Sequence, residues 1–247
     1  STSRGLGDVY KRQIVTIVEI MGRNAGWLTG AAALSEGEDC EGPDLIYLPE
    51  TVFDLQKFSV KVKELLKKKT SIVVAVSEGI RTADGNYVCE LGNSVDFVDA
   101  FGHKQLSGTA SYLASFIAGE IGCKTRAIEL STLQRSASHA ASRVDILEAY
   151  QVGGAAVKAA DEGDSGKMVV LQRLSDDPYQ CGTEVKDVHK IANDEKLVPR
   201  EWVNEDGTYV TGEFVSYVRP LIQGDVSPVM VDGIPRHLYT PRELSER

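Results

Sequence analysis

Runs of apolar and β-branched residues recur along this chain, and stretches with helical spacing separate them. Two of the runs, IVTIVEI at 14–20 and SIVVAV at 71–76, are continuous rather than alternating. A continuous run of this length is typical of a strand that is buried on both faces of a parallel sheet. Residues 45–48, 125–130 and 168–174 are further candidate strands. Such strands need helices on both sides to cover their side chains.

Helical patterns occupy the segments between these strands. In 54–69, apolar residues return every three or four positions, and Asp54 stands where its carboxylate can cap the first turn. Strands and helices that alternate along the chain predict an α/β fold with a mainly parallel sheet covered by helices. We expect the helices over 25–34, 54–69, 105–121 and 143–160, with shorter pieces around 213–221.

Composition excludes several classes of function. The net charge of the 247 residues is −9, and a phosphate backbone needs a basic surface, so we expect no nucleic-acid partner. The four cysteines form no C-x-x-C and the histidines are scattered, so no metal site or disulfide framework is indicated. No apolar run is long enough to cross a bilayer, and no secretory signal is visible. We therefore expect a cytoplasmic protein with reduced thiols.

The first residues differ from the rest of the chain. Residues 1–13 (STSRGLGDVYKRQ) are small, basic and aperiodic, and they run abruptly into the strand at 14–20. We interpret them as a non-native leader and treat 14–247 as the portion that folds. A genuine loop is the alternative interpretation.

Polar residues directly follow the two buried strands, where parallel sheets bind their ligands. Met21, Gly22 and Arg23 come after the first strand. Gly22 permits a tight turn, and the free N–H groups of the helix that starts there suit an anion, as does Arg23. Glu78 follows the second strand, and its carboxylate can accept hydrogen bonds from sugar hydroxyls. The plainer alternatives are a turn with a surface arginine, and a glutamate that caps a loop or pairs with a lysine.

Two arginines, Arg126 and Arg135, flank the later strand predicted at 125–130. Paired guanidinium groups match the geometry of a phosphate dianion, and each contact is worth roughly 1.5–3 kcal/mol. The alternative is ion pairing at the surface, which contributes little to stability.

Together these segments resemble the phosphofructokinase family. VEIMGRNAGWLTGAAAL is similar to that family's strand, Met-Gly-Arg turn and helix, and VAVSEG is similar to its later strand ending in a substrate-binding glutamate. TRAIELSTLQR is similar to the segment with its phosphate-binding arginines, and LVPREWVNEDG and VRPLIQG resemble C-terminal segments of one bacterial branch. The resemblance runs from Ile14 to about Tyr239. It implies a phosphofructokinase-like fold that is truncated at the N-terminus.

The resemblance also implies roles for individual residues. Glu78 would hold the sugar hydroxyls, and the two arginines would bind the 6-phosphate, with one of them able to reach a neighbouring subunit's site. Arg23 would also offset charge on the transferring phosphoryl group. The catalytic base is expected upstream of Ile14 and is assigned to no residue here. The implied contacts to fructose 6-phosphate are Met21, Gly22, Arg23, Glu78, Arg126 and Arg135.

The implied reaction is a step of glycolysis that moves a phosphoryl group to the 1-hydroxyl of fructose 6-phosphate. Its donor would be pyrophosphate, or alternatively ATP, bound with Mg²⁺ in a homo-oligomer. Thr132 stands where ATP-dependent bacterial members usually carry histidine, and Ser136 and Ala137 replace a usual Gly-Gly, which favours pyrophosphate. The family's donor loops should lie upstream of Ile14. We therefore expect this portion to be inactive by itself and its sheet to expose an unpaired strand edge.

Two other functions compete with this one. A non-catalytic phosphofructokinase-like subunit, which binds substrate or regulates a partner, would lack the donor loops in its full-length sequence. A dinucleotide-dependent oxidoreductase is compatible with the alternation of strands and helices, but no G-x-G-x-x-G follows a strand in this chain.

Overall fold

The computed structural model describes residues 13–92 and 106–236. Within the chain, two compact units can be distinguished, and each draws on two separate stretches of sequence. The first unit, which contains the parallel sheet, comprises Ser1–Gln134 and Lys186–Arg219. The second comprises Arg135–Val185 and Pro220–Arg247.

Most of the expected leader, residues 1–12, lies outside the described residues. Gln13, which we placed at the end of the leader, is buried, and its side-chain amide donates a hydrogen bond to the carbonyl of Leu66 at 2.5 Å. Gln13 is therefore part of the packed fold, although we had assigned it to the leader.

Four parallel strands form the sheet of the first unit, in the spatial order β2-β3-β1-β4. This arrangement confirms the predicted α/β class with a parallel sheet. β1 is central, and β4 pairs with β1 and with no other strand among the described residues. Ile128 of β4 is 43% exposed, as expected for a residue on an edge strand. The strands are β1 (Ile14–Ile20), β2 (Leu45–Tyr47), β3 (Ser71–Ser77) and β4 (Lys124–Glu129).

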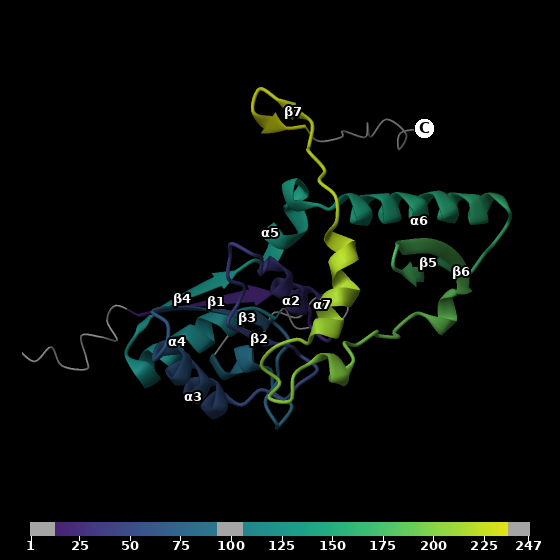
Figure 1. The fold of residues 1–247 in the computed structure, drawn as a ribbon. Coiled ribbons are helices and arrows are strands. Elements are labelled where there is room, and N and C mark those ends of the chain that lie inside the picture. The colour runs from purple at the N-terminus through teal and green to yellow at the C-terminus, as the bar shows by residue number, and fades with distance from the viewer. Residues whose placement is uncertain (1–12, 93–105, 237–247) are drawn as a thin grey trace, which may run out of the picture. The chain divides into compact units, whose positions relative to one another are not determined.

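Helices cover both faces of this sheet, as Figure 1 shows. On one face, α3 (Leu55–Leu66) and α4 (Thr109–Ile121) pack over the side chains of Val15 and Ile17. On the other face, α2 (Trp27–Gly30) and α7 (Gly212–Val218) contribute to a second cluster. Successive residues of a strand point to opposite faces, so the continuous apolar run of β1 supplies both cores.

Side chains and glycines set the limits of the helices. The carboxylate of Asp54 accepts hydrogen bonds from the backbone N–H groups of Gln56 and Lys57, which confirms it as the cap of α3. α4 begins at Thr109, later than the expected start at residue 105, because Gly108 adopts a left-handed φ of 95°. The helix expected over 25–34 is divided into α2 and a 3-10 turn, Ala31–Ser35.

The second unit combines one long helix with two pairs of strands, β5 with β6 and β7 with β8. α6 (Arg143–Asp161) matches the helix predicted at 143–160, and α5 (Ser131–Ser136) crosses the boundary between the units. The strand expected at 168–174 is present, but it pairs in a separate two-stranded sheet instead of joining the parallel sheet. No helix among the described residues is long and apolar enough to span a bilayer. The strands here are β5 (Lys167–Asp176), β6 (Tyr179–Asp187), β7 (Met230–Val231) and β8 (Ile234–Pro235).

Phe58 of α3 offers a test of this packing. Its ring is 1% exposed and lies 5.6 Å from the ring of Tyr47 and 5.4 Å from that of Phe53. Replacing it by alanine leaves a cavity, so Phe58→Ala should lower the free energy of unfolding by about 3–5 kcal/mol in chemical denaturation. Val60 on the same helix is 54% exposed, and Val60→Ala should change that energy by less than about 0.5 kcal/mol. Equal effects of the two substitutions would contradict the assignment of the buried face.

Candidate functional site

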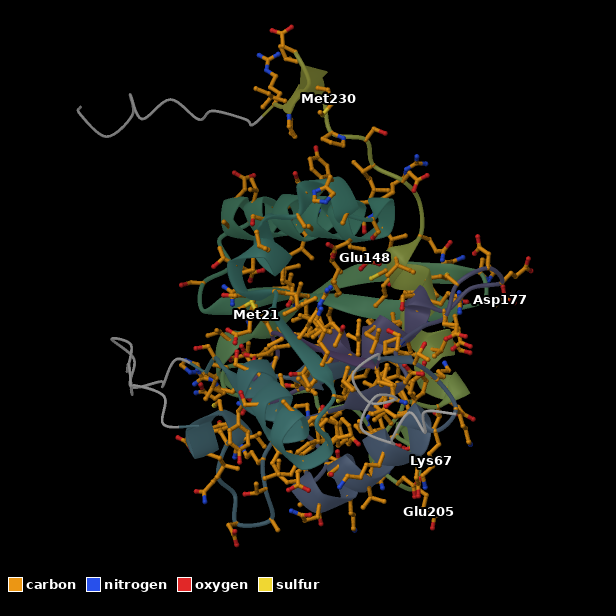
Figure 2. All side chains as sticks on the ribbon, turned by 90° about the vertical axis from the view of Figure 1, so that its left-hand side faces the viewer. Met21, Lys67, Glu148, Asp177, Glu205 and Met230 are labelled. Atoms are coloured by element: carbon orange, nitrogen blue, oxygen red, sulfur yellow. The ribbon has the colours of Figure 1, made fainter. Side chains whose placement is uncertain are left out.

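The carboxyl ends of β1 and β3 bring the Met-Gly-Arg turn and Glu78 together. Ile20 pairs with Ser77 in the parallel register, so the residues that follow them emerge side by side. The backbone N–H of Gly22 donates to Oε1 of Glu78 at 3.3 Å, and the N–H of Glu78 donates to the carbonyl of Ile20 at 3.0 Å. Met21, labelled in Figure 2, stands at the start of this turn.

Close backbone contacts lock the two strand ends against each other. The hydroxyl of Ser77 donates to the carbonyl of Gly22 at 2.5 Å and accepts from the N–H of Gly79 at 3.0 Å. A Cβ atom at Gly79 would lie 1.7 Å from the carbonyl oxygen of Arg23, so no larger residue fits there without a backbone shift. Gly22 has a φ of +148°, which side-chain-bearing residues rarely adopt. Glycine is therefore required on both sides of this contact.

The residues that follow the Met-Gly-Arg turn are also held by hydrogen bonds to a distant segment of the sequence. The side-chain amide of Asn24 donates to Oε1 of Glu195 at 2.6 Å, and its oxygen accepts from Nη2 of Arg81 at 3.3 Å. The indole N–H of Trp27 donates to the carbonyl of Lys196 at 2.6 Å. A segment more than 160 residues further along the chain thus fixes the residues next to Arg23.

Gln134, in the helix that follows β4, also supports the turn. Its Oε1 accepts a hydrogen bond of 3.0 Å from the backbone N–H of Met21. This contact is not predictable from the sequence, because the two partners are 113 positions apart and a single glutamine carries no recognisable pattern. The carbonyl of Glu19 accepts from the N–H of Leu130 at 3.2 Å, which holds the end of β4 beside β1.

Glu19, which precedes Ile20 in β1, is a buried carboxyl group that the sequence pattern presents only as one residue of a strand. Its side chain is 5% exposed, and Oε2 accepts from the backbone N–H of Ala110 at 2.8 Å. Burial raises the pKa of Glu19 to about 7, the hydrogen bond from Ala110 opposes that rise, and the charges of Glu129 and Glu78 add to it. Near neutral pH this carboxyl group is therefore partly protonated.

The two arginines predicted to bind phosphate are both exposed. Arg126 is exposed in the middle of β4, opposite Thr16, three positions before the strand's end at Glu129. At ~3.3 Å per residue it stands roughly 10 Å back from the carboxyl edge. Arg135 is exposed in the last turn of α5 and is the first residue of the second unit. The structure thus places Gly22 and Glu78 in contact but does not bring Arg126 to them, and the phosphate contacts remain predictions.

The edge formed by these strand ends suits a polyhydroxylated anion. Glu78 supplies hydrogen-bond acceptors, Arg23 supplies a positive charge, and both are only partly buried, so a ligand can reach them. Over residues 13–92 and 106–236, no group of three or more His, Cys, Asp or Glu side chains is placed to hold a metal ion. Among these described residues we therefore assign no ligand to the Mg²⁺ expected with a phosphoryl donor.

Comparison with known proteins agrees with this geometry. The family model described as phosphofructokinase matches residues 9–160, which include the Met-Gly-Arg turn, Glu78 and both arginines. This chain belongs to the phosphofructokinase family.

Several similar phosphofructokinases belong to one branch of the family. The chain is 40% identical over 233 residues to pyrophosphate–fructose 6-phosphate 1-phosphotransferase of Halomonas elongata, covering 94% of the chain and 55% of that relative. It is 39% identical to the enzyme of the same name from Xanthomonas campestris, covering 91% of the chain and 53% of that relative. The crystal structure of pyrophosphate-dependent phosphofructokinase from Nitrosospira multiformis matches with a TM-score of 0.78 and 33% identity, over 94% of this chain and 53% of that one. The chain thus spans about half the length of these phosphofructokinases.

The buried carboxyl group of Glu19 should make stability depend on pH. Its pKa is raised from 4.5 to about 7 on folding, so the folded state binds the extra proton and loses stability as the pH rises through this window. Glutamine does not titrate. The free energy of unfolding of the native chain, relative to Glu19→Gln, should fall by about 2–3 kcal/mol between about pH 5 and pH 8 in urea denaturation.

Glu64, exposed on α3, provides the matched control for this measurement. Glu64→Gln should keep the pH dependence of the native chain. A constant difference between the native chain and Glu19→Gln across the same pH range would show that Glu19 titrates normally.

Proposed function

We propose that this chain carries the fructose 6-phosphate site of a pyrophosphate-dependent 6-phosphofructokinase. The observation that supports it best is the hydrogen bond between the Gly22 N–H and Glu78, because it joins the two substrate-binding segments expected of the family. The relatives reported above act on fructose 6-phosphate and pyrophosphate according to their names. The proposal extends that activity to the whole protein of which these residues form a part.

In this proposal each residue of the carboxyl edge has a separate task. Glu78 accepts hydrogen bonds from sugar hydroxyls, and the backbone around Met21 and Gly22 lies against the sugar. The guanidinium of Arg23 offsets negative charge on the phosphoryl group as it moves to the 1-hydroxyl. Phosphoryl transfer relies mainly on positioning and on electrostatic stabilisation, which this rigid turn can supply. We assign no residue of this chain as the base that accepts the proton from the 1-hydroxyl.

In the same proposal, Arg126 and Arg135 bind the 6-phosphate. Both side chains are exposed, and Arg126 stands on the edge strand of the sheet, where a second subunit could approach. This placement fits a homo-oligomer in which an arginine serves a neighbouring subunit's site. We further propose that Mg²⁺ accompanies the donor, where it would neutralise phosphate charge, and that the enzyme acts in cytoplasmic glycolysis.

Pyrophosphate is the proposed donor, with ATP as the alternative. Thr132 and the Ser136–Ala137 pair support it from the sequence, and the names of the relatives agree. The test is formation of fructose 1,6-bisphosphate by the full-length protein that contains this sequence, with Mg²⁺ and either donor. We expect turnover with pyrophosphate and none above background with ATP. Turnover with ATP alone would overturn the choice of donor, and turnover with neither would overturn the proposed function.

The role of Glu78 can be tested separately. Glu78→Gln keeps an oxygen that can accept the Gly22 N–H, so the turn should persist, while the charged acceptor for the sugar hydroxyl is lost. A hydrogen bond to a charged group contributes ~1.5–3 kcal/mol, so the Kd for fructose 6-phosphate should rise about 10- to 100-fold in calorimetric titration.

The control is again Glu64→Gln, which should leave the Kd unchanged. Should Glu78→Gln bind fructose 6-phosphate as tightly as the native chain, Glu78 does not hold the sugar.

A further inference from the structure

The first turn of α4 is hydrogen-bonded to glutamates from three adjacent strands. Three consecutive residues of the helix each make one of these bonds, and each glutamate stands within one residue of the end of its strand. The bonds run from Thr109 Oγ1 to the carbonyl of Glu78 (3.2 Å), from the Ala110 N–H to Oε2 of Glu19 (2.8 Å) and from Ser111 Oγ to Oε1 of Glu129 (2.8 Å).

α4 has no capping side chain of its own at this end. Its N-cap is Gly108, which makes no side-chain hydrogen bond to the helix. The first N–H groups of a helix have no partner within the helix, and a buried one without a partner is costly. Ala110 is fully buried, so the carboxylate of Glu19 supplies an acceptor that the local sequence lacks.

The three bonds are not equivalent. Ser111 and Glu129 are both exposed, so water can replace their hydrogen bond at little cost. Ala110, Thr109 and Glu19 are buried, and water does not compete there. Of the bonds that hold the first turn of α4, the one from Ala110 to Glu19 therefore contributes most. The bond from Thr109 then fixes the backbone of Glu78 relative to this turn.

We propose that Glu19 is a positioning residue for sugar binding. It holds the first turn of α4, and through Thr109 it holds the carbonyl of Glu78, so that the Glu78 carboxylate stays beside the Gly22 N–H in the geometry that meets the substrate. The inference rests on the proposed function, because it assumes that Glu78 binds fructose 6-phosphate.

The test compares two substitutions at Glu19 in the 247-residue chain. Glu19→Leu removes the acceptor and should raise the Kd for fructose 6-phosphate at least 10-fold in calorimetric titration. Glu19→Gln keeps an acceptor oxygen and should restore the Kd to within about 3-fold of the native value, since one hydrogen bond is retained. Val210→Ala, in the core on the other face of the sheet, controls for lost stability and should leave the Kd unchanged.

A second variant covers the case in which Glu19→Leu does not fold. Thr109→Val keeps the shape of a buried side chain but removes the bond to the Glu78 carbonyl, so it should raise the Kd as Glu19→Leu does. Native affinity in Thr109→Val, or a loss in Glu19→Gln as large as in Glu19→Leu, would overturn the proposal.

Amide hydrogen exchange separates this inference from the proposed function. If the native chain does not bind fructose 6-phosphate, the proposed function fails, but the anchoring of α4 can still be measured. Glu19→Leu or Thr109→Val should then speed exchange in the first turn of α4 at least 10-fold while exchange around Leu113 and Ile117 stays slow. Unchanged exchange in that first turn would overturn the role of Glu19 by itself.

Discussion

The parallel pairing of β1 with β3 on one side and β4 on the other is the constraint on which the rest of the structure depends. It aligns the carboxyl ends of three strands at one edge, so polar residues far apart in the sequence meet there. It also buries both faces of β1, which requires a helical layer on each side. The candidate site and the two cores are thus consequences of one register.

Carboxylates at the strand ends connect the sheet to its helices. α2 and α4 both start from a glycine that offers no side-chain cap. Glu50, after β2, accepts from the N–H groups of Gly26 and Val198, at 2.8 and 2.9 Å, and Glu19 accepts from the N–H of Ala110. Because the Ala110 N–H binds Glu19 of β1, the first turn of α4 cannot shift from β1 without losing this hydrogen bond. This coupling keeps the residues around the Gly22 turn rigid. Precise positioning of a substrate requires such rigidity.

Local patterns predicted much of the first unit. The runs of β1 and β3, the capping of α3 by Asp54 and the juxtaposition of Gly22 and Glu78 follow from periodicity and from the rule that parallel strands share a ligand-binding edge. Contacts between distant segments were not predictable, because a lone Gln134 or Glu19 carries no periodic signal. The pairing of β5 with β6 was missed for the same reason: an apolar run shows that a strand exists but not which strand it joins.

The central claim is that fructose 6-phosphate binds at the carboxyl edge of this sheet, and nuclear magnetic resonance of the isotopically labelled chain tests it most directly. Titration with fructose 6-phosphate should shift the backbone amide signals of Met21, Gly22, Arg23 and Gly79 most, and glucose should leave them unchanged. Shifts confined to other parts of the chain, or equal shifts with glucose, would contradict the account.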